Sequence, residues 1–115
     1  MNGRLGTGTL ALMVATTPTQ WATGLMKRRK IASNAGMLFI YPTSLPRTFW
    51  MKNTSIPLDV AFLDGNGKVM EIRHLAPQST DPVTSKRPAK YALEVNCGWF
   101  AQNRVKVGSI LTIWE

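Results

Sequence analysis

Apolar and polar positions along the chain fall into short runs, most with the length or alternation of β-strands. The clearest pattern covers residues 60–72, where the apolar run Val60–Leu63 is followed by the turn sequence Asp64–Gly67 and by further apolar positions over Lys68–Ile72. Asp-Gly and Asn-Gly pairs readily adopt the positive φ angles of tight hairpin turns. The pattern therefore predicts a β-hairpin.

Other apolar runs predict further strands. They cover residues 9–15, 36–41, 91–96 and 109–114. The run Gly36–Tyr41 is apolar throughout, which is typical of a strand buried on both faces. The run Tyr91–Asn96 alternates instead, and it places Glu94 on the opposite side of the strand from Leu93 and Val95. A single turn of helix is expected at residues 98–103.

A helix is predicted after the first strand. Thr17 is a suitable N-cap, Pro18 suits the first helical position, and Gln20 completes a capping box. We expect this helix to extend to about Arg28 with Trp21 facing the core. One short N-terminal helix and about seven strands predict a mainly β fold, a small antiparallel barrel or sandwich with a minor α+β character.

The length of 115 residues, 44% of them hydrophobic, predicts one domain that buries about two thirds of its unfolded surface. The glycine-rich residues 1–8 predict a flexible N-terminal arm, followed by a single domain over residues 9–115. The apolar run Leu10–Ala15 is too short for a membrane span or for the core of a signal peptide. We therefore expect a soluble chain without an export signal, located in the cytoplasm or in a virion.

Charge indicates what kind of partner the surface favours. Fourteen Lys and Arg against six Asp and Glu give a net charge of +8, which favours polyanions or an acidic protein. The basic residues that we expect to contact a partner are Arg4, Lys27, Arg29, Lys30, Lys86 and Arg87. The aromatic residues lie in apolar runs and are expected in the core, where they cannot stack on bases. The net charge is therefore the only feature that favours nucleic-acid binding.

Cysteine and histidine each occur once, as Cys97 and His74. A single cysteine excludes an internal disulfide and a paired-cysteine metal motif. Because His74 and Cys97 are far apart in sequence, we predict neither a catalytic dyad nor a metal site, and Cys97 is expected to be a small buried apolar residue. No catalytic residue and no cofactor is predicted.

Several separated blocks resemble one known family. They are GLMKR, GMLFIYP, FWMKNTSIPLDVAFLDGNGKV, STDP, YALEVNCGWF and VKVGS. In their order and spacing, from about Thr9 to Leu111, they resemble the domain of unknown function 192 (DUF192) family. The resemblance implies a compact β-rich barrel with one helix. It implies no biochemical activity, so no catalytic residue is carried over to this chain.

The segment FWMKNT at residues 49–54, here called the elbow, sets bulky apolar side chains beside polar ones. The candidate ligand-binding residues are Arg28, Trp50, Lys52, Asn53, Asp59, Ser79 and Glu94. In one hypothesis Lys52 or Arg28 binds an anionic group and Asn53 orients the ligand. In the other, which we favour, Asp59 pairs with Lys52 while Asn53 and Thr54 satisfy backbone groups of the bend.

Three functional hypotheses follow. The preferred one is a non-enzymatic interaction module that binds a protein partner or joins a homo- or hetero-oligomeric assembly, such as a phage particle, through its basic faces and its arm. The alternative is a small-ligand-binding protein with a pocket at the elbow. The third is a nucleic-acid-associated basic protein, expected only from the charge.

Overall fold

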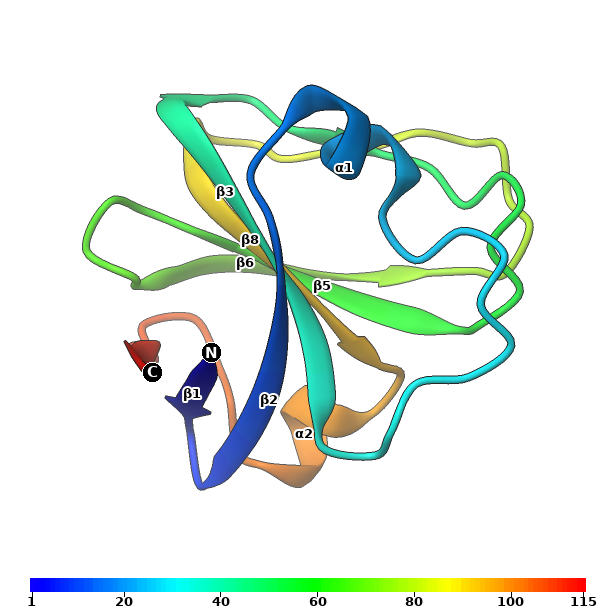
Figure 1. Cartoon of the computed structure of the whole chain (residues 1–115). Helices are drawn as coiled ribbons and strands as arrows, with labels where there is room; N and C mark the ends of the chain where they lie inside the picture. The colour runs from blue at the N-terminus through cyan, green and yellow to red at the C-terminus, as the bar shows by residue number, and fades with distance from the viewer.

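The computed structural model describes all residues 1–115 and shows a curled seven-stranded sheet that forms a half-barrel (Figure 1). The strand order is β6 (Val69–Leu75), β5 (Leu58–Leu63), β8 (Ala89–Asn96), β3 (Ala35–Leu45), β2 (Gly8–Ala15), β1 (Asn2–Leu5) and β9 (Thr112–Trp114). Two short strands, β4 (Thr48–Phe49) and β7 (Val83–Thr84), form a second sheet. The helices are α1 (Pro18–Thr23) and α2 (Trp99–Gln102). The predicted mainly β fold is confirmed.

One strand pair differs from the expected antiparallel sheet. Strands β2 and β3 are parallel, with Leu12 opposite Gly36 and Val14 opposite Leu38. Parallel neighbours require a connection that returns the chain to the same end of the sheet. Helix α1 and the segment up to Asn34 form that connection, and they pass over one face of the half-barrel (Figure 1).

The C-terminal segment joins the two ends of the sheet. The Val69 N–H donates to the Ser109 carbonyl and the Leu111 N–H donates to the Gly67 carbonyl, both at 2.8 Å. The following strand β9 pairs with β1 at the other end of the sheet. Residues 108–114 therefore narrow the open side of the half-barrel.

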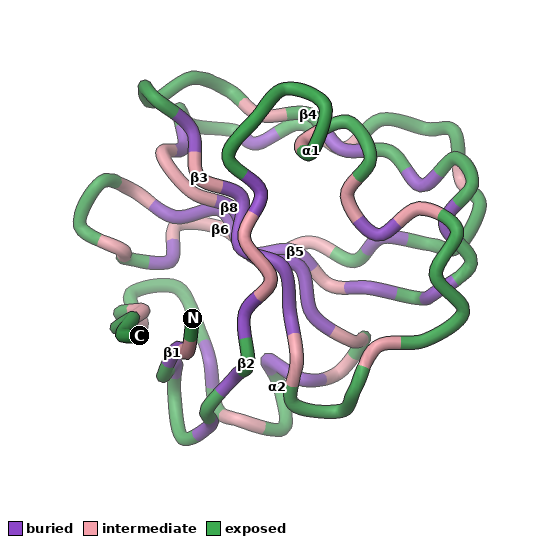
Figure 2. The backbone as a smooth tube through the Cα atoms, in the orientation of Figure 1, coloured by how far each residue is buried: buried purple, intermediate pink, exposed green.

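Two clusters of buried residues pack against the sheet, one on each face, and Figure 2 shows that the buried residues concentrate along its central strands. On β3, Phe39 contributes to the core on the α1 side and Leu38 to the core on the α2 side, and both are fully buried. The predicted two-sided burial of residues 36–41 is confirmed for the central part of the strand. A strand covered on both faces can carry apolar side chains at every position.

Helix α1 begins as predicted and ends earlier. The Thr17 hydroxyl accepts the Gln20 N–H at 3.2 Å, and the Gln20 side chain accepts the Thr17 N–H at the same distance, which is the expected capping box. The helix ends at Thr23 and not near Arg28, because Gly24 adopts a positive φ of 46° that is incompatible with a continuing helix.

The N-terminal residues are part of the sheet. Strand β1 pairs with β2 on one side and with β9 on the other, and the Leu5 side chain is 0% exposed. The predicted flexible arm over residues 1–8 is therefore wrong for residues 2–5. The glycines serve close packing here: a Cβ at Gly3 would lie 2.9 Å from the Leu12 side chain.

Candidate functional site

A cavity of about 210 Å³ lies between helix α1 and the elbow. One wall is formed by α1 and the residues after it, the other by β4 and the elbow, and side chains from β3 and β8 form the floor. The lining residues are Trp21, Ala22, Thr23, Gly24, Leu25, Met26, Phe39, Thr48, Phe49, Trp50, Met51, Thr54 and Glu94. The cavity is thus mainly apolar and contains one ionisable side chain.

That ionisable side chain is Glu94 on β8, which is only 4% exposed. Its cross-strand neighbours are Met37 on β3 and Val60 on β5, both apolar. Its carboxyl group forms no hydrogen bond or ion pair within the protein, and burial alone raises its pKa to about 8. At neutral pH the carboxyl group at the base of the cavity is therefore mostly protonated, and it has no partner within the protein.

The segment after α1 passes close to this carboxyl group at Gly24. A Cβ built on Gly24 would lie 3.6 Å from Glu94 Oε1 and 3.4 Å from the Phe39 ring. The positive φ of Gly24 also disfavours other residues at this position. Gly24 therefore lets the segment after α1 run directly over the carboxyl group.

Aromatic rings form much of the remaining wall. The Phe39 and Phe49 rings meet edge to face with centroids 5.0 Å apart. Trp50 is 47% exposed and lies at the rim, with the Lys52 ammonium 5.5 Å from its ring centroid. The negative faces of aromatic rings attract cations, so these walls suit a positively charged group.

The elbow is held in place by backbone hydrogen bonds on both sides. The Lys27 N–H donates to the Asn53 carbonyl at 2.8 Å, and the Met51 N–H donates to the Ser79 carbonyl at 2.8 Å. Asn53 itself adopts a positive φ of 59°, which asparagine tolerates better than most residues. The Thr54 hydroxyl donates to the Lys52 carbonyl at 3.4 Å, as expected of a residue that satisfies the bend, whereas Asn53 contributes through its main-chain carbonyl.

The structure brings together only part of the predicted ligand-binding set. Trp50 and Glu94 line the cavity, whereas Lys52, Asn53, Asp59 and Ser79 do not. Arg28 instead borders a separate groove near β2, together with Lys30. The predicted anion site of Lys52 or Arg28 is therefore not assembled in this cavity.

The expected pairing of Asp59 with Lys52 is wrong. Asp59 Oδ1 lies 2.9 Å from His74 Nδ1, and Asp59 Oδ2 accepts the Gly98 N–H at 2.9 Å. Asp59 and His74 are direct cross-strand partners on β5 and β6, so the sheet register brings these two side chains together. Both carboxylate oxygens thus have partners other than Lys52.

Cys97 also differs from expectation, because it is exposed and not buried. Its Sγ lies 3.7 Å from His74 Nδ1, although the two residues are 23 positions apart. The prediction that His74 and Cys97 lie apart is therefore wrong. Desolvation and the nearby Asp59 carboxylate raise the pKa of the Cys97 thiol, so the thiol is not activated as a nucleophile.

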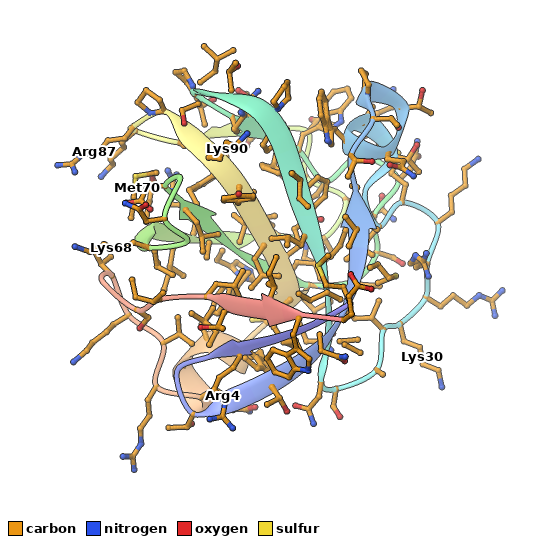
Figure 3. All side chains as sticks on the ribbon, turned by 60° about the vertical axis from the view of Figure 1, so that its left-hand side comes forward. Arg4, Lys30, Lys68, Met70, Arg87 and Lys90 are labelled. Atoms are coloured by element: carbon orange, nitrogen blue, oxygen red, sulfur yellow. The ribbon has the colours of Figure 1, made fainter.

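The six basic residues expected to contact a partner are all exposed: Arg4, Lys27, Arg29, Lys30, Lys86 and Arg87. They belong to β1, to the segment after α1, and to the loop between β7 and β8. Figure 3 shows Arg4, Lys30 and Arg87 extending from separate parts of the molecule. The positive charge is therefore distributed around the domain.

Residues of the cavity that the sequence did not indicate come mainly from α1 and β3, such as Trp21, Gly24 and Phe39. They are distant from the elbow in sequence, and only the parallel β2–β3 connection places them there. One signal was available: Glu94 stands within an apolar strand flanked in sequence by Leu93 and Val95. In a strand covered on both faces, such a residue is buried.

The fold and cavity define a small β half-barrel domain with a buried carboxyl group at the base of an apolar site. The chain belongs to the DUF192 family, described as uncharacterised ACR, whose model matches residues 2–113. Among the curated proteins, none matches this sequence. None of the helices in the structure is both long and apolar enough to cross a membrane.

Two solved structures are closely similar. A protein from Sinorhizobium meliloti 1021, described as a "putative transcription regulator", is 35% identical with a TM-score of 0.93, over 96% of this chain and 91% of that chain. A protein of unknown function from Novosphingobium aromaticivorans DSM 12444 is 29% identical with a TM-score of 0.92, over 97% of this chain and 84% of that one.

Proposed function

We propose that this domain binds a small organic amine in the cavity between α1 and the elbow. The observation that carries the proposal is the Glu94 carboxyl group, which is buried at the base of the cavity without a protein partner. A buried carboxyl group without a partner costs stability, and such groups concentrate at functional sites. A ligand ammonium group would donate hydrogen bonds to this carboxyl group and pair with its ionised form.

The walls support the same ligand class. Phe39, Phe49 and Trp50 line the same cavity as the carboxyl group, and cations bind favourably over aromatic rings. The volume of about 210 Å³ is below the roughly 300–1,000 Å³ of typical drug-sized ligand pockets. The expected ligand is therefore a small amine with an apolar or aromatic body.

The affinity for an ammonium ligand is expected to depend on pH. Because the pKa of Glu94 is raised to about 8, the carboxyl group must lose its proton before it can pair with a cation. Below pH 8 each unit of pH should therefore change the affinity about tenfold, with tighter binding at higher pH. A neutral ligand of the same shape should lack this dependence.

The test is a titration of the full chain with small aromatic and aliphatic amines, each compared with the alcohol of the same shape, by calorimetry at pH 6, 7 and 8. We expect binding of at least one amine in the wild type and a loss of about tenfold or more in Glu94→Gln, as for a buried charged pair. Trp50→Ala should weaken binding less, because Trp50 lies at the rim.

The matched control is Asp81→Asn, which removes an exposed carboxylate outside the cavity and should leave the affinity unchanged. The proposal fails if no amine binds, or if Glu94→Gln binds amines as tightly as the wild type.

A second candidate is assembly of several copies of this chain, and the exposed edge of the sheet favours it. Ile113 and Trp114 on β9 are exposed, as is the neighbouring Ile110, and β9 is the last strand of the sheet. An exposed edge strand with apolar side chains can pair with another such edge. Sedimentation of the wild type and of Trp114→Lys tests this: a monomer at all concentrations excludes it.

The third candidate, nucleic-acid binding, is supported by the net charge of +8 and by the description of the Sinorhizobium protein as a "putative transcription regulator". The separate positions of Arg4, Lys30 and Arg87 weigh against one continuous binding face (Figure 3). If this candidate is correct, the affinity for a nucleic-acid duplex should fall steeply as the salt concentration rises. The absence of binding at low salt would remove it.

A further inference from the structure

Three potential metal ligands converge on one point at the end of strands β5, β6 and β8. Asp59, His74 and Cys97 each present one donor atom, and the three atoms lie within 4.8 Å of one another. His74 Nδ1 is 2.9 Å from Asp59 Oδ1 and 3.7 Å from Cys97 Sγ. Cys97 and His74 are exposed, so the cluster is open to solvent.

The sheet holds these residues in position. Asp59 on β5 stands directly opposite His74 on β6, and Cys97 follows the last residue of β8. The Cys97 N–H donates to the Pro57 carbonyl at 3.1 Å, which ties the start of the turn after β8 to the residue before β5. Asp59 and His74 therefore come from adjacent strands, and Cys97 comes from the turn directly after β8, which is hydrogen-bonded to the start of β5.

The Asp59 carboxylate is also oriented by a second contact. Its Oδ2 accepts the backbone N–H of Gly98, a residue with a left-handed φ of 90°. This hydrogen bond leaves Oδ1 directed toward His74 and Cys97. Hydrogen bonds of this kind, from outside the ligand set, orient ligating carboxylates in metal sites.

We propose that Asp59, His74 and Cys97 form a site for a divalent transition metal, with zinc as the best-suited ion. One thiolate, one imidazole and one carboxylate are a ligand set that zinc accepts. Zinc–ligand distances of about 2.0–2.3 Å place tetrahedral ligands about 3.3–3.8 Å apart, so small side-chain adjustments suffice. The fourth position remains available to water or to a further ligand.

The geometry distinguishes a metal site from a nucleophilic cysteine triad. In a triad the base uses its two ring nitrogens separately, one toward the nucleophile and one toward the orienting carboxylate. Here Asp59 and Cys97 both face the same nitrogen, His74 Nδ1. The imidazole therefore cannot relay a proton between them, whereas a metal ion bound by all three would lie where the donor atoms converge.

This site is independent of the amine site. Along β5, Asp59 and Val60 point to opposite faces of the sheet, and Val60 is the cross-strand neighbour of Glu94. Val60 belongs to the core on the α1 side, whereas Val95, the partner of Asp59 on β8, belongs to the core on the α2 side. Failure of one proposal therefore leaves the other unaffected.

The experiment is a titration of the reduced, metal-free full chain with Co²⁺, followed by competition with Zn²⁺. We expect one Co²⁺ per chain, a thiolate-to-cobalt charge-transfer absorption, visible bands of tetrahedral intensity, and displacement by Zn²⁺. Cys97→Ser should abolish the charge-transfer band. His74→Ala and Asp59→Asn should each weaken binding about tenfold or more.

The controls separate a built site from binding to the thiol alone. Because His74 and Cys97 are exposed, their substitution should leave the circular dichroism of the fold intact, which keeps these two variants informative even if Asp59→Asn unfolds. Asp81→Asn should bind Co²⁺ as the wild type does. The proposal is overturned if the wild type shows no charge-transfer band, or if His74→Ala retains the band with undiminished affinity.

Discussion

Replacing Glu94 by Gln is expected to stabilise the protein at pH 9 by about 3–5 kcal/mol while changing its stability little near pH 4. The pKa of the Glu94 carboxyl group is near 4.5 when exposed and is raised to about 8 by burial in the fold. Each unit of such a difference corresponds to about 1.4 kcal/mol. Gln has a similar shape and no charge to bury, so it should avoid this cost.

The sign of the pH dependence follows from the protons bound in each state. Between about pH 4.5 and 8 the unfolded chain has lost the Glu94 proton while the folded chain retains it. The folded wild type should therefore lose stability as pH rises through this window, with no further change from this group above it. Glu94→Gln should lack this contribution to the slope.

Urea denaturation of both proteins at pH 4.5, 6, 7.5 and 9 measures the difference directly. Asp81→Asn is the matched control, because it removes an exposed carboxylate and should parallel the wild type. Stability curves of Glu94→Gln and wild type that stay parallel across this range would show that the carboxyl group is not desolvated. The amine-binding proposal would then lose its physical basis.

Truncating Leu5 to Ala is expected to cost about 2–5 kcal/mol of stability, although the residue lies near the N-terminus. Leu5 is fully buried on β1, in the core on the α2 side together with Leu10 and Trp99. Removing the Leu5 side chain leaves a cavity in this core. Because β1 is paired with a strand on each side, the surrounding structure cannot fully close that cavity. A flexible arm would show no such effect.

Arg4→Ala is the control for this prediction, because Arg4 is the adjacent residue and its side chain is exposed. Its substitution should change the free energy of unfolding by about 0.5 kcal/mol or less. Thermal or urea unfolding of the two variants side by side gives the comparison. Equal free energies of unfolding for Leu5→Ala and Arg4→Ala would mean that β1 contributes no more to stability than a flexible arm does.

Coverage of the sheet on both faces accounts for the two candidate sites. On the α1 side, β8 places Glu94 beneath aromatic walls. At the end of the same strand, the next residue is Cys97, which lies next to Asp59 and His74. Alternation along a strand separates successive side chains, so one set of strands supports two chemically different sites.

Local features of the fold followed directly from the sequence. The β5–β6 hairpin forms around Asp64, whose carboxylate accepts the N–H groups of Asn66 and Lys68. The start of α1 follows from contacts between Thr17 and Gln20. In both cases the interacting groups are at most four residues apart, so the pattern of residue types was sufficient to predict them.

The tertiary structure decided the rest. Strands β1 and β9 pair with each other although they lie at opposite ends of the sequence. Strands β2 and β3 become parallel neighbours only through the α1 connection. The cavity and the Asp59–His74–Cys97 cluster likewise depend on strand register between distant segments. The sequence by itself determined the strands of the long apolar runs, the β5–β6 turn, the start of α1 and the family. Which side chains meet depended on long-range pairing, because a change of one residue in register moves every side chain of a strand to the opposite face.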